Sequence, residues 1–122
     1  MHPYLPQHEL LEFCTKNGVQ VTAYSPLGSD PKNGVLTDPT VASIAKTHEK
    51  TPAQVLIAWA LQRGTIVIPK SANPTRITEN YDAKDVHLTA EEMRVLDDLY
   101  KVHGRRYVDP KSFWKVDVFS KV

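Results

Sequence analysis

The chain has 122 residues, enough for one small domain with a usable hydrophobic core. Its hydrophobic content of 41% and charged content of 24% are ordinary for a globular protein, and a net charge of +1 gives no argument for binding nucleic acid or an anionic membrane surface. No apolar run approaches the roughly 20 residues that span a bilayer, and the first residues lack the zones of a signal peptide. The single cysteine, Cys14, excludes an internal disulfide and fits a reducing, cytoplasmic location.

Helices and strands alternate along the chain. Apolar residues at helical spacing predict the helices, and short β-branched runs bounded by Gly or Pro predict buried strands. In chain order the expected elements are a helix over 7–17, a strand over 19–23, a long polar loop over 29–38, helices that begin at Pro39 and Pro52, a strand over 65–69, a helix over 74–81 and a last helix after Thr89. This order is typical of α/β units with a parallel crossover. It supplies only two convincing strands, although a parallel pair normally needs neighbours to bury its edges.

The end of the second predicted strand has the composition of a phosphate site. Lys70 and Ser71 stand where the strand ends, Asn73 can cap the following helix, and Pro74 suits its first position. The first turn of that helix offers unpaired N–H groups and a dipole that favours anions, with Lys70 and Arg76 nearby. The alternative is a capped surface helix whose Lys and Arg are simply solvated.

Three blocks of sequence resemble aldo-keto reductases. Their C-terminal cofactor signature resembles Ile68-Pro-Lys-Ser followed by Asn73-Pro-x-Arg-Ile-x-Glu-Asn. The strand and loop that precede it in the family resemble the segment from Val21 to Ser29, and a landmark further upstream resembles His2-Pro-Tyr-Leu. The blocks follow one another in family order, and the tail over 109–119 resembles the ending of fungal members. The family fold is an eight-stranded (β/α) barrel of roughly twice this length or more.

The resemblance implies an α/β fold that is the C-terminal part of a (β/α)8 TIM barrel. We expect about two parallel strands with flanking helices, and an incomplete barrel, because the chain corresponds to the sixth helix through the eighth strand and the tail. Residues 1–122 would form a single partial domain, with a C-terminal tail over 100–122.

Aldo-keto reductases reduce aldehydes and ketones by hydride transfer from NADPH, and this resemblance implies NADP as the cofactor. Their catalytic Asp, Tyr, Lys and His lie in the first half of the barrel, and none of those motifs occurs here. No catalytic residue is therefore assigned, and we expect the chain alone to be inert. NADPH is the expected partner, with a small carbonyl substrate only when the N-terminal half is present, and with no nucleic acid or membrane.

The first group of implied cofactor residues follows the strand over 19–23. Tyr24 would lay its ring against the nicotinamide, while Ser25, Leu27 and Ser29 would meet the pyrophosphate. The loop after Ser29 would fold over the cofactor as a belt, although Asp30 here precedes Pro31 where many relatives have proline directly. Read without the resemblance, Tyr24 is a half-buried strand tyrosine.

The second group follows the strand over 65–69. The residues expected to hold the adenosine 2′-phosphate, which separates NADP from NAD, are Lys70, Ser71, Asn73 and Arg76. Glu79 and Asn80 would reach the adenine edge one turn further along the helix. For Glu79, an exposed helix carboxylate is nearly as good an interpretation.

Three hypotheses stay open at this point. The chain can be the terminal portion of an NADPH-dependent reductase whose catalytic half is encoded separately. It can instead be a stand-alone, non-catalytic nucleotide-binding or interaction module, or a truncated product without a function of its own.

Overall fold

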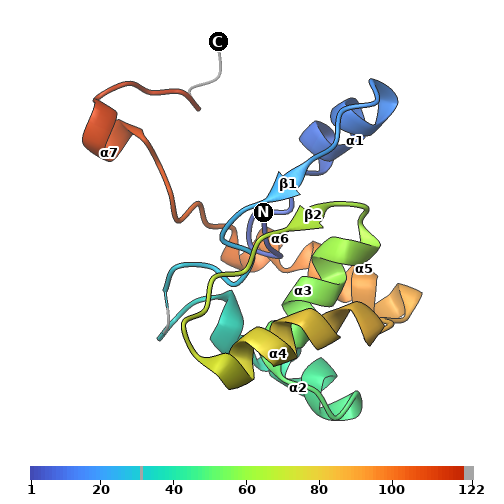
Figure 1. Ribbon diagram of the computed structural model, residues 1–122. Helices are drawn as coiled ribbons and strands as arrows, with labels where there is room; N and C mark the ends of the chain where they lie inside the picture. The colour runs from blue at the N-terminus through green and yellow to red at the C-terminus, as the bar shows by residue number, and fades with distance from the viewer. Residues whose placement is uncertain (31, 120–122) are drawn as a thin grey trace.

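The computed structural model describes residues 1–30 and 32–119. Pro31 of the predicted loop and the last three residues of the predicted tail lie outside the described residues. The elements, in the order and with the labels of Figure 1, are α1 (His8–Lys16), β1 (Thr22–Ala23), η1 (Val35–Thr37), α2 (Pro39–Thr47), α3 (Pro52–Gln62), β2 (Ile66–Val67), α4 (Pro74–Asp82), η2 (Ala83–Asp85), α5 (Ala90–Asp98), α6 (Tyr100–His103) and α7 (Lys111–Trp114).

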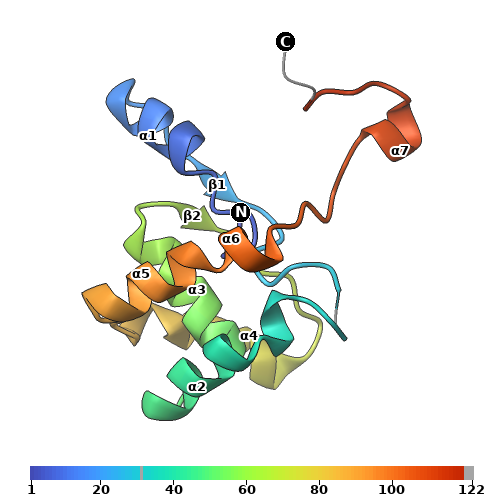
Figure 2. The same cartoon turned by 180° about the vertical axis from the view of Figure 1, so that it is seen from behind.

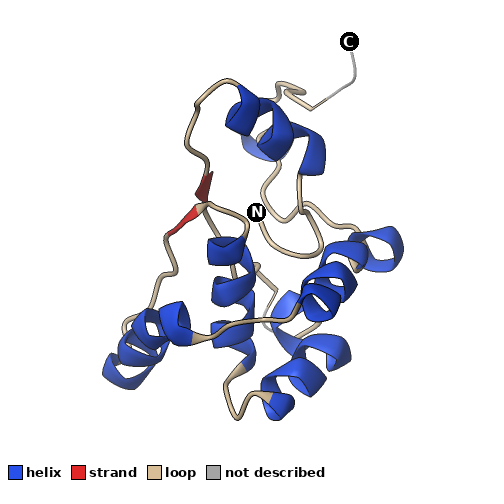
Figure 3. Cartoon of the chain, turned by 90° about the vertical axis from the view of Figure 1, so that its right-hand side faces the viewer, coloured by secondary structure: helices blue, strands red, loops and turns tan. Residues whose placement is uncertain are grey.

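The sheet is a parallel pair of short strands. β1 and β2 pair with Thr22 opposite Ile66 and Ala23 opposite Val67. Figure 3 shows how short both strands are beside the helices. The parallel pair with flanking helices confirms the predicted fold class, an incomplete part of a (β/α)8 barrel.

The prediction of a fully buried strand over 65–69 is wrong in two respects. The strand is shorter than predicted, and Ile66 and Ile68 are 51% and 54% exposed. Successive side chains of a strand point to opposite faces. Only the face that carries Val67 packs against the core, so the alternate side chains on the other face stay exposed within the described part of the chain.

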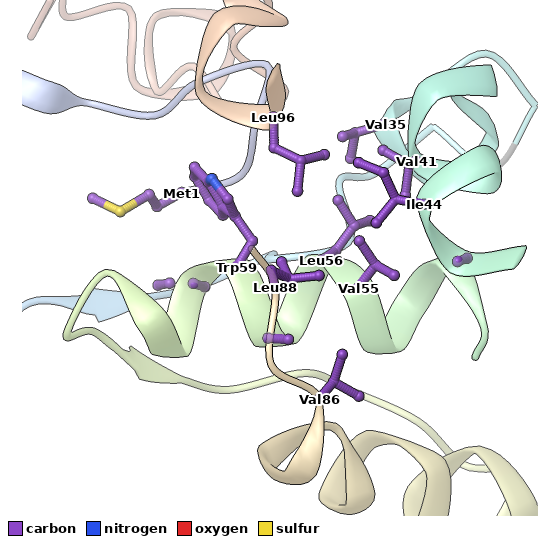
Figure 4. Packing of buried hydrophobic residues seen from close by; sticks show 14 of the residues in the cluster. Met1, Val35, Val41, Ile44, Val55, Leu56, Trp59, Val86, Leu88 and Leu96 are labelled. Atoms are coloured by element: carbon purple, nitrogen blue, oxygen red, sulfur yellow. The ribbon is translucent and has the colours of Figure 1, made fainter. Parts of the chain in front are cut away.

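Helix α3 forms the centre of the hydrophobic core. Seven consecutive residues of α3, from Gln54 to Ala60, are buried, as expected for a helix covered on several sides. Figure 4 shows the cluster around it, to which α3 contributes Val55, Leu56 and Trp59, α2 contributes Val41 and Ile44, and α5 contributes Leu96. The indole Nε1 of Trp59 donates to Asp97 Oδ1 at 3.0 Å, which satisfies its polar atom at the edge of the core.

The starts of the main helices were predictable from local capping chemistry. Asp38, Thr51, Asn73 and Thr89 each accept a hydrogen bond from a first-turn backbone N–H, and three of these helices begin with proline. An N-cap of this kind contributes about 1 kcal/mol to helix stability. These caps fix where the chain leaves each loop, including the loop before α4.

The first helix, α1, and the last, α7, lie apart from this core, although Met1 and Tyr4 at the start of the chain belong to it. Figures 1 and 2 show α1 on one side of the strand pair and α2 to α5 on the other, with α7 extending away from the body. The apolar face expected on the first helix is not buried, since Leu10 and Phe13 are exposed and α1 has no buried residue. Leu11 of that face is partly buried and packs against the core, whereas Leu10 and Phe13 stay exposed, so the periodicity alone did not show which side chains are covered. Among these residues no helix combines the length and apolar character needed to cross a membrane.

Candidate functional site

The candidate site lies where both strands end. The ladder continues past the strands, because Ile68 N donates to Ala23 O at 3.4 Å. The segments after β1 and β2 therefore leave the sheet at the same edge. In open and closed parallel sheets this carboxyl edge is where ligands bind.

A first cavity of about 320 Å³ lies between these two segments. Its lining comprises Ser25, Pro26, Leu27, Gly28, Ile68, Pro69 and Lys70. A turn closed by the Gly28 N–H on Ser25 O at 3.0 Å shapes one wall. Ser25 has φ 46 and Gly28 has φ 73. A left-handed conformation is uncommon for serine and costs free energy, and such residues concentrate at ligand sites.

A second cavity of about 420 Å³ lies at the start of α4. Its lining comprises Lys70, Ser71, Ala72, Asn73, Pro74 and Arg76. Asn73 Oδ1 accepts from Arg76 N at 3.1 Å, and Ser71 Oγ accepts from Asn73 N at 3.1 Å. Two cationic side chains thus share one hollow with a hydroxyl and the positive end of a nine-residue helix, an arrangement that favours a dianion.

Lys70 joins the two cavities because it lines both. A ligand with two anionic groups could therefore run from the turn after β1 to the start of α4. The arrangement has the chemistry of a dinucleotide phosphate site. The described part of the chain contains no group of three His, Cys, Asp or Glu that could hold a metal ion.

Four predicted site residues lie outside these two cavities. Tyr24 is half exposed directly after β1, and Ser29 is exposed at the start of the following loop. Asn80 lines an adjoining, more apolar hollow between α3 and α4, which shares Ser71 with the second cavity. Glu79 is partly buried, and its backbone carbonyl accepts from Gln54 Nε2 of α3 at 3.1 Å. The structure therefore brings together six of the ten predicted residues.

Two tail residues that no sequence motif indicated contact the loop after β1. Tyr107 Oη accepts from Val35 N at 3.2 Å, and Arg105 Nη1 lies 3.2 Å from Asp30 Oδ2. The backbone N–H groups of Asn33 and Lys32 lower the pKa of the Asp30 carboxyl, and Arg105 adds to this shift. These contacts join residues more than 70 positions apart, so no local motif could have found them.

The fold and the site together define a class of protein. Adjacent parallel strands, flanking helices and a cationic hollow after the second strand describe the closing part of a (β/α)8 barrel that binds phosphate groups behind its last strands.

Comparisons with known proteins give the family. The model of the aldo/keto reductase family matches residues 1–101, and the chain belongs to this family. It is 48% identical over 114 residues to a 9,11-endoperoxide prostaglandin H2 reductase of Trypanosoma cruzi, covering 93% of this chain and 40% of that protein. It is 44% identical over 116 residues to the mouse aldo-keto reductase family 1 member A1, covering 89% of this chain and 35% of that protein.

A solved structure agrees with this membership. The structure of aldose reductase from Giardia lamblia matches with a TM-score of 0.89 and 33% identity, over 98% of this chain and 41% of that chain. The chain thus spans about two fifths or less of the length of these relatives. Membership supports an oxidoreductase function, and the family generally uses NAD(P)H.

Proposed function

We propose that this chain is the C-terminal, cofactor-binding portion of an NADP-dependent aldo-keto reductase. The observation that carries the proposal is the position of Lys70, which lines both cavities and so links the turn after β1 to the cationic start of α4. We take residues 1–122 as one partial domain whose tail begins near residue 100.

The residues present fit the cofactor. The 2′-phosphate of NADP is a dianion, and the hollow at α4 offers Lys70, Arg76, the Ser71 hydroxyl and a helix N-terminus. Ser25 and Leu27, across the adjoining cavity, would meet the pyrophosphate, with Ser29 beside them. Tyr24 would stack on the nicotinamide. Bound NADPH supplies the hydride that reduces a carbonyl group.

The chain's own residues would bind and orient this cofactor but not complete the reaction. Carbonyl reduction needs an acid that protonates the oxygen as hydride arrives. The family's catalytic Asp, Tyr, Lys and His have no counterpart in the 122 residues. We therefore propose that the isolated chain binds NADPH without turning over aldehydes or ketones, and that a small carbonyl substrate is engaged only with the N-terminal half of a barrel.

A titration of the chain with NADPH and with NADH, followed by fluorescence, tests the proposal. We expect tighter binding of NADPH. Lys70→Ala or Arg76→Ala should each weaken NADPH binding by about 1.5–3 kcal/mol, or about 10- to 150-fold, because each removes a charged hydrogen bond to the 2′-phosphate. Both variants should leave NADH binding much less affected.

Lys46→Ala is the matched control, since Lys46 is an exposed lysine in the last turn of α2. It should leave the affinities for both dinucleotides unchanged. Equal, millimolar affinity of the wild-type chain for NADPH and NADH would contradict a 2′-phosphate site. Carbonyl turnover by the chain alone would contradict the proposed inactivity.

The alternative of a non-catalytic nucleotide-binding or interaction module predicts the same binding result. A reading frame that continues upstream of Met1 and encodes the catalytic residues would favour the reductase. A chain that neither binds NADPH nor combines with such a half would favour a truncated product.

A further inference from the structure

Between β1 and α2, the described loop residues 24–30 and 32–38 are held from outside by the C-terminal tail. We call this segment the belt loop. We propose that Arg105 and Tyr107 of the tail are positioning residues that fix the belt loop in the conformation that meets the cofactor pyrophosphate. This inference rests on the proposed function, because the belt loop carries Ser25, Leu27 and Ser29.

Tyr107 holds the middle of the belt loop through both ends of its side chain. Its Oη accepts the backbone N–H of Val35 at 3.2 Å. Its ring occupies the space above Gly28, where an added Cβ would lie 3.0 Å from Tyr107 Cε2, and an added Cβ at Gly34 would lie 3.0 Å from Tyr107 Oη. At Gly28 an added Cβ would press first on the Tyr107 ring, whereas at Gly34 it would collide first with the backbone carbonyl of Asp30 and then meet Tyr107, so glycine fits best at both turns.

The Tyr107 ring also contacts the N-terminal turn. The ring lies 4.9 Å from the ring of His2, centroid to centroid, at an interplanar angle of 53°. His2 is buried, and Val35, which donates to Tyr107, is completely buried in the core. Tyr107 thus lies between the N-terminal turn and the belt loop, and it contacts both.

Arg105 fastens the first half of the belt loop. Its Nη1 lies 3.2 Å from Asp30 Oδ2, and its backbone N–H donates to Tyr4 O at 2.9 Å. The other carboxylate oxygen of Asp30 accepts from Lys32 N at 3.1 Å and Asn33 N at 3.0 Å. Asp30 therefore connects the turn of the loop to the tail. The exposed ion pair contributes little by itself, so the packed Tyr107 is the principal contact.

The far end of the belt loop is tied to the same N-terminal turn. Tyr4, whose carbonyl accepts from Arg105, donates its hydroxyl to Asp38 Oδ2 at 2.6 Å. The loop is therefore anchored near Gly28, Asp30, Val35 and Asp38, and the tail supplies or supports each of these anchors. The cavity beside Ser25 and Leu27 opens directly before the first anchor.

These contacts predict a particular pattern of binding losses. The pyrophosphate is common to NADPH and NADH, whereas the 2′-phosphate is not. Releasing the belt loop should therefore lower the affinities for NADPH and NADH by the same factor and leave the ratio of the two affinities unchanged. Lys70→Ala, in contrast, should reduce that ratio.

The experiment compares Tyr107→Ala, Tyr107→Phe and the wild-type chain in two measurements. Amide hydrogen exchange at Val35 and along the belt loop reports the tail contact without any cofactor. Tyr107→Phe, which loses only the acceptor, should raise exchange at Val35 by about 2- to 10-fold, and Tyr107→Ala should raise it further and extend the effect to Gly28 and Gly34. Phe113→Ala, in the tail helix α7, is the control, because Phe113 is exposed, and it should leave exchange at Val35, Gly28 and Gly34 unchanged.

The second measurement is the affinity for NADPH and NADH. Tyr107→Ala should weaken both about 10-fold, with partial rescue in Tyr107→Phe, which keeps the ring. Unchanged affinities in Tyr107→Ala, or a loss confined to NADPH, would overturn the positioning role. Unchanged exchange at Val35 would overturn the contact itself. If the wild-type chain binds neither dinucleotide while Tyr107→Ala still raises exchange in the belt loop, the proposed function fails, whereas the link between tail and loop is upheld.

Discussion

Replacing Tyr4 by phenylalanine should destabilise the chain by about 1.5–3 kcal/mol, the usual contribution of a hydrogen bond to a charged group. The Tyr4 hydroxyl donates to Asp38 Oδ2 at 2.6 Å, and both residues are buried. The other oxygen of Asp38 accepts from Thr40 N at 2.7 Å and Val41 N at 3.3 Å at the start of α2. The variant keeps this cap but leaves Oδ2 without its donor in a site that water reaches poorly.

Urea unfolding followed by circular dichroism measures this loss. Tyr81→Phe is the matched control, because Tyr81 is exposed on α4, and its free energy of unfolding should stay within about 0.5 kcal/mol of the wild type. If Tyr4→Phe and Tyr81→Phe were equally stable, the buried hydrogen bond would contribute nothing and the reasoning would be refuted.

The same pair gives an alkaline signature. Burial, followed by the hydrogen bond to Asp38, raises the pKa of Tyr4 above its ordinary value of 10.0. Above pH 10 the unfolded chain therefore loses this proton while the folded chain keeps it, so the folded state binds more protons and stability falls as pH rises. Tyr4→Phe should remove that part of the alkaline loss, whereas Tyr81→Phe should retain it.

Two further predictions concern the core and the acid range. Leu56→Ala should lower the free energy of unfolding by about 2–5 kcal/mol, because Leu56 is completely buried. Leu61→Ala, on the more exposed side of α3, should lower it much less. Equal losses in the two variants would contradict the central place of α3 in the core. Burial is the main cause that lowers the pKa of His2 from 6.5 to about 3. As pH falls below 6.5, the unfolded chain therefore binds a proton at His2 while the folded chain does not. Between pH 7 and pH 5 this group should lower the free energy of unfolding of the wild type by about 2 kcal/mol. His2→Gln should lose less stability over that range in urea unfolding, and exposed His87→Gln should behave as the wild type; the same drop in all three would contradict a buried, neutral His2.

The parts of the site that depend on neighbouring residues could be predicted from the sequence. Asn73 and Pro74 start α4 as expected, and this alone places Arg76 and Lys70 around one hollow. Capping is a bond between residues two or three apart, so sequence spacing is sufficient to describe it. The order of helices and strands and the resemblance to the barrel family predicted a parallel pair of strands, and β1 and β2 are parallel.

What the sequence could not predict depends on distant neighbours. The β-branched run Ile66 to Ile68 has the composition of a buried strand, but burial requires a covering layer on each face, and composition does not say whether one is present. For the same reason the spacing of α1 did not show which of its apolar residues are covered: Leu11 packs against the core, whereas Leu10 and Phe13 are exposed. The sequence predicted residues 100–122 as a tail without a periodic pattern, so nothing in it indicated that Arg105 and Tyr107 would contact Asp30 and Val35.

This division between local and distant contacts bears on how the proposed site would work. In the proposed site, discrimination between NADP and NAD would depend on residues 70–76, which are arranged by one strand end and one capped helix start. Placement of the belt loop depends on the tail and the N-terminal turn, which meet only in the folded chain. Substitutions in the first region should therefore change which dinucleotide is preferred, and substitutions in the second should change how tightly either is held. A variant at Tyr107 that altered the preference, or one at Arg76 that did not, would show that the two regions are not separate in this way.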